Sequence, residues 1–165
     1  MSKRDLTMDD VRAVMALQAE RPERDTYKAV ERLAGETCGF QLLTILKYVE
    51  KDAVVERLSS SDEKAYPIGG RKPLDKITMS HDVTGQGDIF LAADKAQVRA
   101  AFFDHELIFS LGITAIMNVP VRHAGRRLGT LNFCGEEGNY GAREQAIGRV
   151  LAGLLAPALL KAVGD

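Results

Sequence analysis

The segment Thr114–Cys134 reads TAIMNVPVRHAGRRLGTLNFC, and it decides the fold that we predict for this chain. Two apolar runs, Thr114–Arg122 and Arg127–Cys134, flank a short stretch around Ala124-Gly125-Arg126. Apolar runs joined by a short loop that contains glycine are typical of a β-hairpin. We therefore expect the last two strands of a sheet to lie side by side here, in antiparallel order.

The length of the hairpin loop determines which residues of the two strands face each other. With a three-residue loop at 124–126, His123 pairs with Arg127, and Asn118 lies opposite Asn132. A two-residue loop shifts the register by one residue and separates the two asparagines. In the three-residue case one face carries the polar floor of a pocket, formed by Thr114, Asn118, Thr130, Asn132 and Cys134. The alternative is that the two asparagines are structural amides that bond to loop backbone.

Helices and a further pair of strands are expected before this hairpin. Thr7 and Asp10 have the spacing of a capping box at the start of a first helix. Apolar residues at helical spacing indicate a second helix that Asp25 caps and that ends near Thr37. Phe40–Tyr48 is apolar on both faces, as in an interior strand, and Ala53–Leu58 returns beside it.

One more helix is expected after the hairpin, and an irregular segment lies before it. Ala142–Lys161 carries a strong apolar stripe, and Pro157 should kink its last turns. Glu63–Gly112 is irregular apart from two short helices, at Asp94–Phe103 and Asp104–Leu111. Ordered insertions of this length are uncommon and are usually functional.

The order of elements predicts an α+β fold over residues 1–165, as a single domain. Terminal helices cover one face of an antiparallel sheet, and the irregular helical excursion covers the other face. A pocket between the sheet and the excursion is the natural consequence.

This order of elements resembles that of the GAF domain family, within the wider PAS/GAF type. The final hairpin carries the resemblance, through Ile116-Met117-Asn118-Val119-Pro120-Val121 and Leu128-Gly129-Thr130-Leu131-Asn132-Phe133. The resemblance covers about residues 7 to 162 and extends to Tyr66–Lys72 and Phe102–Gly112. It implies a ligand cavity on the sheet face away from the terminal helices, with a cyclic nucleotide, a tetrapyrrole or another small molecule as ligand. It also implies dimerisation through the terminal helices.

Composition restricts the classes of partner. Of the 165 residues, 45% are hydrophobic and 27% are charged, and the formal net charge of −1 gives no field that would attract nucleic acid or an anionic membrane. The first residues have no apolar stretch typical of a signal peptide, and the apolar run near Val150–Leu160 is too short to span a bilayer. We therefore expect a cytoplasmic protein, with Cys38 and Cys134 as free thiols.

Six residues are candidate ligand contacts for a polar or anionic metabolite. The turn Gly69-Gly70-Arg71-Lys72 is interpreted as a lid in which Arg71 binds a carboxylate or phosphate, or else as a solvated loop. The complete set of candidates is Tyr66, Arg71, Lys72, Asn118, Thr130 and Asn132.

An enzyme that uses the same cavity is the alternative function. Its candidate catalytic residues are Asp104, His105 and Cys134, for acid–base or thiol chemistry. Adjacent residues do not face each other on a helix, so Asp104 and His105 are instead expected to form a helix start.

The sequence contains no pattern that predicts a metal or cofactor site. His81, His105 and His123 lack the spacing of zinc ligands, and no phosphate-binding or dinucleotide-binding glycine motif is present. The identity of any cofactor stays open. The broad apolar side of the closing helix predicts a homodimer, and a purely structural dimerisation subunit is a third possible role.

Overall fold

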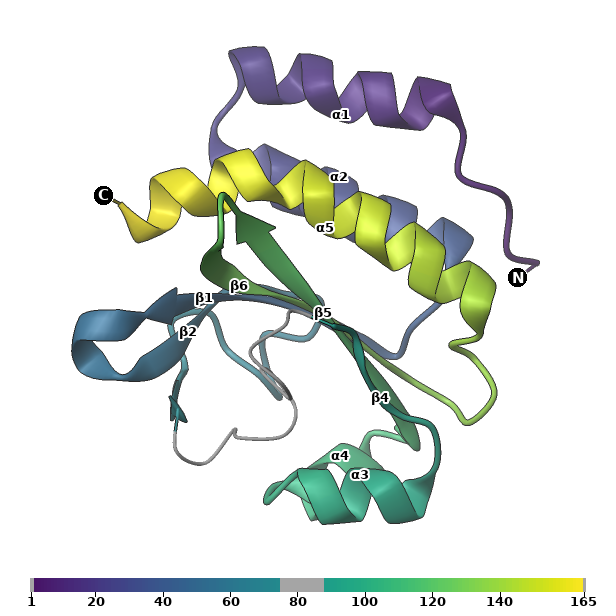
Figure 1. Cartoon of the computed structure of the whole chain (residues 1–165). Coiled ribbons are helices and arrows are strands. Elements are labelled where there is room, and N and C mark those ends of the chain that lie inside the picture. Colours follow the sequence, from purple (N-terminus) through teal and green to yellow (C-terminus); the bar gives the residue numbers. More distant parts are fainter. Residues whose placement is uncertain (1, 75–87, 165) are drawn as a thin grey trace.

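The computed structural model describes residues 2–74 and 88–164, and their strands form one six-stranded antiparallel sheet (Figure 1). The strand order is β3-β2-β1-β6-β5-β4. The strands are β1 (Leu42–Val49), β2 (Val54–Ser60), β3 (Arg71–Pro73), β4 (Phe90–Ala92), β5 (Ala115–His123) and β6 (Arg126–Gly135). Strand β1 pairs with β2 on one side and β6 on the other, so the predicted interior strand is confirmed.

Three long helices lie on one face of this sheet and two short helices lie on the other (Figure 1). The long helices are α1 (Met8–Glu20), α2 (Glu23–Thr37) and α5 (Ala142–Val163), and the short ones are α3 (Lys95–Ala101) and α4 (His105–Ser110). A short 3-10 helix (Glu50–Asp52) connects β1 to β2. The predicted α+β arrangement, with the excursion on the far face, is therefore confirmed.

Two features of these elements correct the sequence analysis. Helix α2 begins at Glu23 after Pro22, so Asp25 lies within the first turn instead of capping it. The irregular segment also contributes the edge strands β3 and β4, which are only three residues long. Strands this short carry too little alternation to be recognised from sequence.

The core lies between the sheet and the helices α2 and α5. Leu151, Leu155 and Leu159 of α5 are fully buried there, and they join Leu131 and Phe133 of β6 in one cluster. Cys38 is also fully buried at the end of α2, as expected for a thiol that behaves as a small hydrophobic residue.

Helix α5 extends two residues beyond the predicted end at Lys161. It continues past Pro157 to Val163, and by length and composition it could cross a membrane. A helix in the core of a protein can have the same length and apolar composition as a membrane span. Here one side of α5 packs against the sheet, which accounts for its apolar composition.

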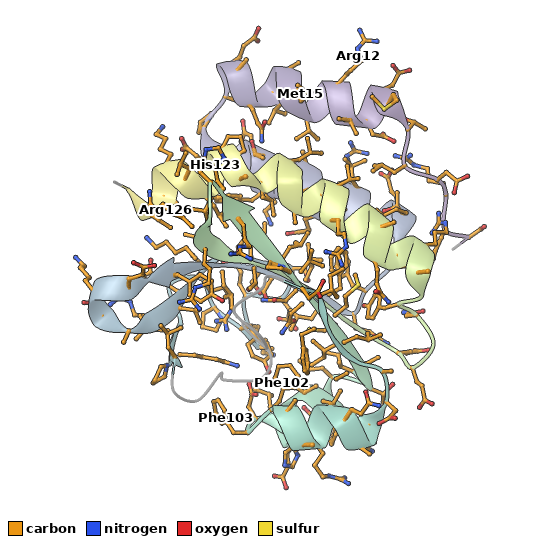
Figure 2. All side chains as sticks on the ribbon, viewed as in Figure 1. Arg12, Met15, Phe102, Phe103, His123 and Arg126 are labelled. Atoms are coloured by element: carbon orange, nitrogen blue, oxygen red, sulfur yellow. The ribbon has the colours of Figure 1, made fainter. Side chains whose placement is uncertain are left out.

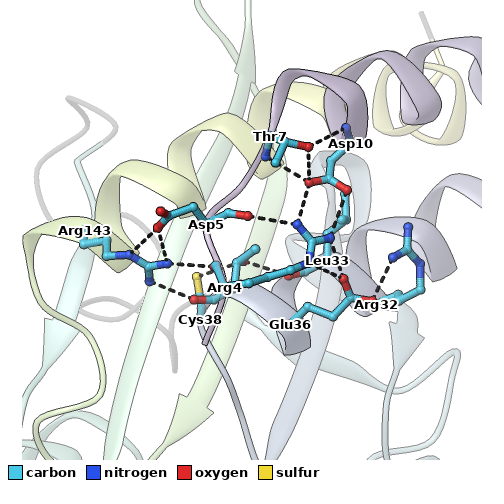
Figure 3. A network of polar contacts seen from close by, with 10 residues as sticks. Arg4, Asp5, Thr7, Asp10, Arg32, Leu33, Glu36, Cys38 and Arg143 are labelled. Carbon is cyan, nitrogen blue, oxygen red and sulfur yellow. Dashed lines mark hydrogen bonds and ion pairs between the residues drawn. The ribbon is translucent and has the colours of Figure 1, made fainter. Parts of the chain in front are cut away.

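The N-terminal residues attach α1 to the rest of the fold through polar contacts (Figure 3). Arg4 donates hydrogen bonds to both carboxylate oxygens of Asp10, at 2.7 and 2.9 Å, and to Glu36 of α2. Arg143 of α5 donates to the Arg4 carbonyl at 2.8 Å. The capping box predicted for Thr7 and Asp10 is present. We call Arg4, Asp5, Asp10, Glu36 and Arg143 the N-terminal network.

Candidate functional site

The hairpin of β5 and β6 places Asn118 directly opposite Asn132. Its turn has two residues, because His123 pairs with Arg126, so the predicted three-residue loop is wrong. A register shift between Val121 and Arg122 places one extra residue, Leu128, in β6. This β-bulge compensates for the shorter turn and restores the pairing of the asparagines.

The side chains on the far face of the sheet enclose a cavity of about 50 Å³ beneath α3 and α4. Every second residue of a strand lies on the same face of the sheet, and paired residues share a face. Thr44 of β1 pairs with Asn132 and Leu42 pairs with Cys134, so these four residues lie on the cavity face. The cavity is lined by Leu42, Thr44, Leu46, Arg57, Tyr66, Lys72, Phe102, Ile108, Ile116, Asn118, Asn132 and Cys134.

Four of the six predicted ligand contacts line this cavity, namely Tyr66, Lys72, Asn118 and Asn132. Thr130 is buried on the same face, opposite Pro120 and Leu46, but it does not line the cavity. Thr114, which was expected to share the polar floor, instead accepts a hydrogen bond from the backbone of Glu137.

Arg71 does not line this cavity, which corrects its predicted role as a ligand contact there, and it lines instead a separate hollow that includes Arg126 and Arg127. It pairs with Glu56 across β2 and β3, and its guanidinium forms ion pairs with Glu56 and Asp52. Lys72 pairs with Val55, which is buried. Successive residues of a strand point to opposite faces, so only one of the two cations can reach the cavity.

The arginine that reaches the cavity is Arg57 of β2, which the sequence analysis missed. Only 6% of Arg57 is exposed, and it pairs with Leu46 on the cavity face of the sheet. Its guanidinium donates to the Pro67 carbonyl at 2.9 Å and stacks 5.0 Å from the centre of the Tyr66 ring. Burial lowers the pKa of Arg57, because desolvation disfavours the charged form.

A signal for Arg57 was present in the sequence. In the run Val54-Val55-Glu56-Arg57 the arginine is two residues from Val55, so it shares the face of a buried apolar residue. The glycines at 69 and 70 are a second signal, because a Cβ atom at Gly70 would lie 2.5 Å from Nη1 of Arg57. The turn therefore uses glycine because the arginine passes against it.

Lys72, Tyr66 and Asp104 form a polar cluster beside Arg57. The ammonium of Lys72 lies 2.9 Å from Oδ2 of Asp104, and the Tyr66 hydroxyl donates to the same oxygen at 3.1 Å. The pKa of Tyr66 lies well above its ordinary value. Burial is the larger cause, and the negative charge of Asp104 is the second. Asp104 and His105 form the start of α4, as predicted, but the Asp104 side chain makes no capping hydrogen bond and instead holds the two cavity-lining groups in place.

The residues proposed for catalysis do not form a catalytic arrangement within the described part of the chain. His105 begins α4, does not line the cavity, and packs 5.6 Å from the Phe109 ring. Cys134 lines the cavity, but burial raises the pKa of its thiol to about 12. A thiol at neutral pH is a weak nucleophile.

Two phenylalanines, Phe102 and Phe103, lie between α3 and α4 (Figure 2). Phe102 lines the cavity, whereas Phe103 is 65% exposed and lies 5.3 Å from the ammonium of Lys72. His81 falls outside the described residues. Among residues 2–74 and 88–164, no three His, Cys, Asp or Glu side chains gather where a metal ion could bind.

No protein-family model and no curated protein matches the sequence. Solved structures with the same arrangement are GAF domains, and the chain has the GAF-domain fold. The GAF domain of a phosphoenolpyruvate-protein phosphotransferase from Coxiella burnetii matches with a TM-score of 0.76 and 17% identity, over 94% of this chain and 93% of that one. The corresponding domain from Acinetobacter gives 0.75 and 13%, over 98% and 96%.

A third match is the chromophore-binding domain of a bacteriophytochrome from R. palustris. It has a TM-score of 0.69 and 13% identity, and it covers 93% of this chain but 62% of that one. At these identities the likeness concerns the fold, and the site has to be interpreted from its own residues.

Proposed function

We propose that this chain is a cytoplasmic GAF-type sensor module that binds a small anionic metabolite in the cavity beneath α3 and α4. The observation that carries the proposal is the buried guanidinium of Arg57, which faces the cavity. Within the described residues it has no carboxylate at ion-pair distance, and its acceptor is the carbonyl of Pro67.

A buried cation of this kind is destabilising unless an anion compensates for its lost hydration. Removing a charged group from water costs several kcal/mol per ion even after relaxation. Asp104 is the acid of this cluster, and it already binds Lys72 and Tyr66. Arg57, Lys72 and Asp104 together leave one positive charge, which an anionic ligand would neutralise with strong charge-assisted hydrogen bonds.

The remaining walls of the cavity suit a small organic molecule. Leu42, Phe102 and Ile116 are apolar, and the amides of Asn118 and Asn132 supply polar groups on the sheet. Such a mixture of apolar walls and few convergent polar groups is usual for ligand sites.

The proteins with similar structures support a sensory role. The matches include domains of sensor histidine kinases from Sinorhizobium meliloti and Bacillus halodurans, with TM-scores of 0.64 and 0.70. They also include the chromophore-binding domain of a bacteriophytochrome. Two of these domains belong to sensor kinases, and we propose the same general role for this chain.

Two matched variants test the proposal. Arg57→Gln removes the cation from the cavity, whereas Arg71→Gln removes an equal charge from the adjacent strand on the other face. Native mass spectrometry of freshly purified protein should detect a retained anion in the parent and in Arg71→Gln, and not in Arg57→Gln. Thermal-shift titrations with inorganic phosphate and with lactate should show the same order. Equal stabilisation of both variants by every anion, or no response in the parent, would contradict the proposal.

A further inference from the structure

The geometry points to a short hydroxycarboxylate as the ligand of this cavity, that is, a carboxylate whose neighbouring carbon carries a hydroxyl group. The inference rests on the proposed function and adds the chemical class of the ligand. It comes from two buried polar atoms that line the cavity, Nε of Arg57 and Oδ1 of Asn132. Neither has a hydrogen-bond partner within the described part of the chain.

Arg57 requires an acceptor from the ligand. Nη1 is used by the Pro67 carbonyl, so the edge of the guanidinium that carries Nε still lacks an oxygen atom. A carboxylate supplies two oxygens in the planar spacing that a guanidinium binds best. The ammonium of Lys72 faces the same cavity and adds a second positive charge.

Asn132 requires a donor from the ligand. It is 4% exposed, and its Nδ2 donates to Oγ1 of Thr44 at 3.1 Å, so Oδ1 is the atom left without a partner. A buried acceptor without a donor is destabilising, because it has lost its hydrogen bond to water. A simple carboxylate has no proton to donate at neutral pH. The ligand therefore needs an O–H or N–H group in addition to its anionic group.

The charges around the cavity favour a hydroxyl over an ammonium as that donor. Arg57 and Lys72 both line the cavity, whereas Asp104 does not line it and holds Lys72 and Tyr66 through Oδ2. A cationic donor would be repelled by the two cations, whereas a neutral hydroxyl is not.

The size of the cavity favours a short acid. A cavity of about 50 Å³ has room for a small molecule only, so the shortest hydroxycarboxylates fit it best. Their carbon atoms would contact Phe102, Ile108 and Ile116 on the apolar side.

The test compares two acids of equal charge and similar size. The isotope-labelled full chain is titrated with sodium lactate and with sodium propionate at matched ionic strength, and backbone and side-chain amide shifts are followed by NMR. Propionate lacks only the hydroxyl. One hydrogen bond contributes about 0.5–1.5 kcal/mol, so lactate should bind roughly two- to twelvefold more tightly.

Two variants assign the preference to its residue. Asn132→Leu is close in shape and lacks the acceptor, so it should bind both acids with the affinity that the parent has for propionate. Thr130→Val is the control, because it removes a hydroxyl from a buried residue of the same strand and face that does not line the cavity. It should keep the preference for lactate.

The outcomes separate this inference from the proposed function. Equal affinity of the parent for lactate and propionate overturns the inference but leaves anion binding intact, provided that Arg57→Gln weakens both. A preference that survives in Asn132→Leu also overturns it. If neither acid nor inorganic phosphate binds the parent, the inference and the proposed function both fail.

Discussion

Asn118 and Asn132 are direct cross-strand partners, although the turn that joins their strands is one residue shorter than the turn expected to align them. The two-residue turn alone would have separated them, and the extra residue Leu128 restores the alignment. The buried side chain of Leu128 belongs to the core on the opposite face of the sheet. The bulge therefore places a leucine in the core on one face of the sheet and keeps the two amides side by side at the cavity on the other face.

The turn itself gives the first prediction. Ala124 and Gly125 have φ values of 47° and 79°, as a two-residue hairpin turn with a left-handed backbone requires. Alanine is strained there, so Ala124→Asn should raise the free energy of unfolding by about 0.5–1 kcal/mol, whereas Gly125→Ala should lower it by about 1–2 kcal/mol. Urea unfolding measures both, and opposite signs are expected. If both variants unfold at the same urea concentration as the parent, residues 124 and 125 do not have the left-handed backbone of this turn.

The pairing of the asparagines shows where sequence reasoning reached its limit. Periodicity identified the strands of the hairpin and the long helices, because these are many residues long. A bulge depends on how a single residue, such as Leu128, packs against the core. The local sequence pattern does not predict it. The alternation with Val55 places Arg57 on a buried face, but the extent of its burial depends on the turn at Gly69-Gly70 and on the ring of Tyr66, which periodicity does not position.

The close approach of Gly70 to Arg57 gives the second prediction. A Cβ at position 70 would lie 2.5 Å from Nη1 of Arg57 and 3.2 Å from the Pro67 carbonyl. Gly70→Ala should therefore displace the guanidinium and weaken lactate binding several-fold without any change of charge. Gly153→Ala is the control, because no atom lies within 4 Å of its added Cβ, and helix α5 should gain about 0.5–1 kcal/mol. Unchanged lactate affinity in Gly70→Ala would show that this contact does not position Arg57.

The buried thiol of Cys134 gives a prediction for alkaline pH. Burial raises its pKa to about 12, whereas a cysteine in the unfolded chain titrates near its ordinary value of about 8.5. Between these values the unfolded chain loses a proton that the folded protein keeps. Stability therefore falls as pH rises through this window, by at most about 1.4 kcal/mol per pH unit for one group.

Cys134→Ala isolates this contribution. The pKa of Tyr27 is also raised by burial, to about 12, but this group is common to both proteins and cancels in the comparison. Urea midpoints measured from about pH 8 to pH 10.5 should fall less steeply in the variant. Parallel curves would mean that the thiol is not protected from ionisation in the folded state.

The N-terminal network gives a prediction for the attachment of α1. Val14 is the buried residue of this helix, so the hydrogen bonds of Arg4 to Asp10 and Glu36 provide much of its attachment. Arg4→Ala should speed amide hydrogen exchange in α1 while α5 stays protected. Arg12→Ala, which removes an exposed pair with Asp9 on the same helix, should have little effect. Equal exchange in the two variants would contradict the role assigned to Arg4.

The same network predicts a dependence on acid. Hydrogen bonds from Arg4 lower the pKa of Asp10 below its ordinary value. A carboxyl with a lowered pKa stabilises the fold above its unfolded value of about 4, and this stabilisation is lost as pH falls further. Acid titration of unfolding should thus be steeper in the parent than in Arg4→Ala.

The outer surface of α1 gives the last prediction, a homodimer. Met8 and Met15 are 73% and 57% exposed, and their spacing of seven residues places them on the same side of the helix. Figure 2 shows Met15 on α1. We expect this side to pack against a second copy, so Met15→Lys should shift sedimentation towards the monomer. Ile68→Lys alters an apolar residue that is 50% exposed outside the helical layer, and it should leave the dimer intact. A parent protein that sediments only as a monomer at micromolar concentration would rule out this assembly.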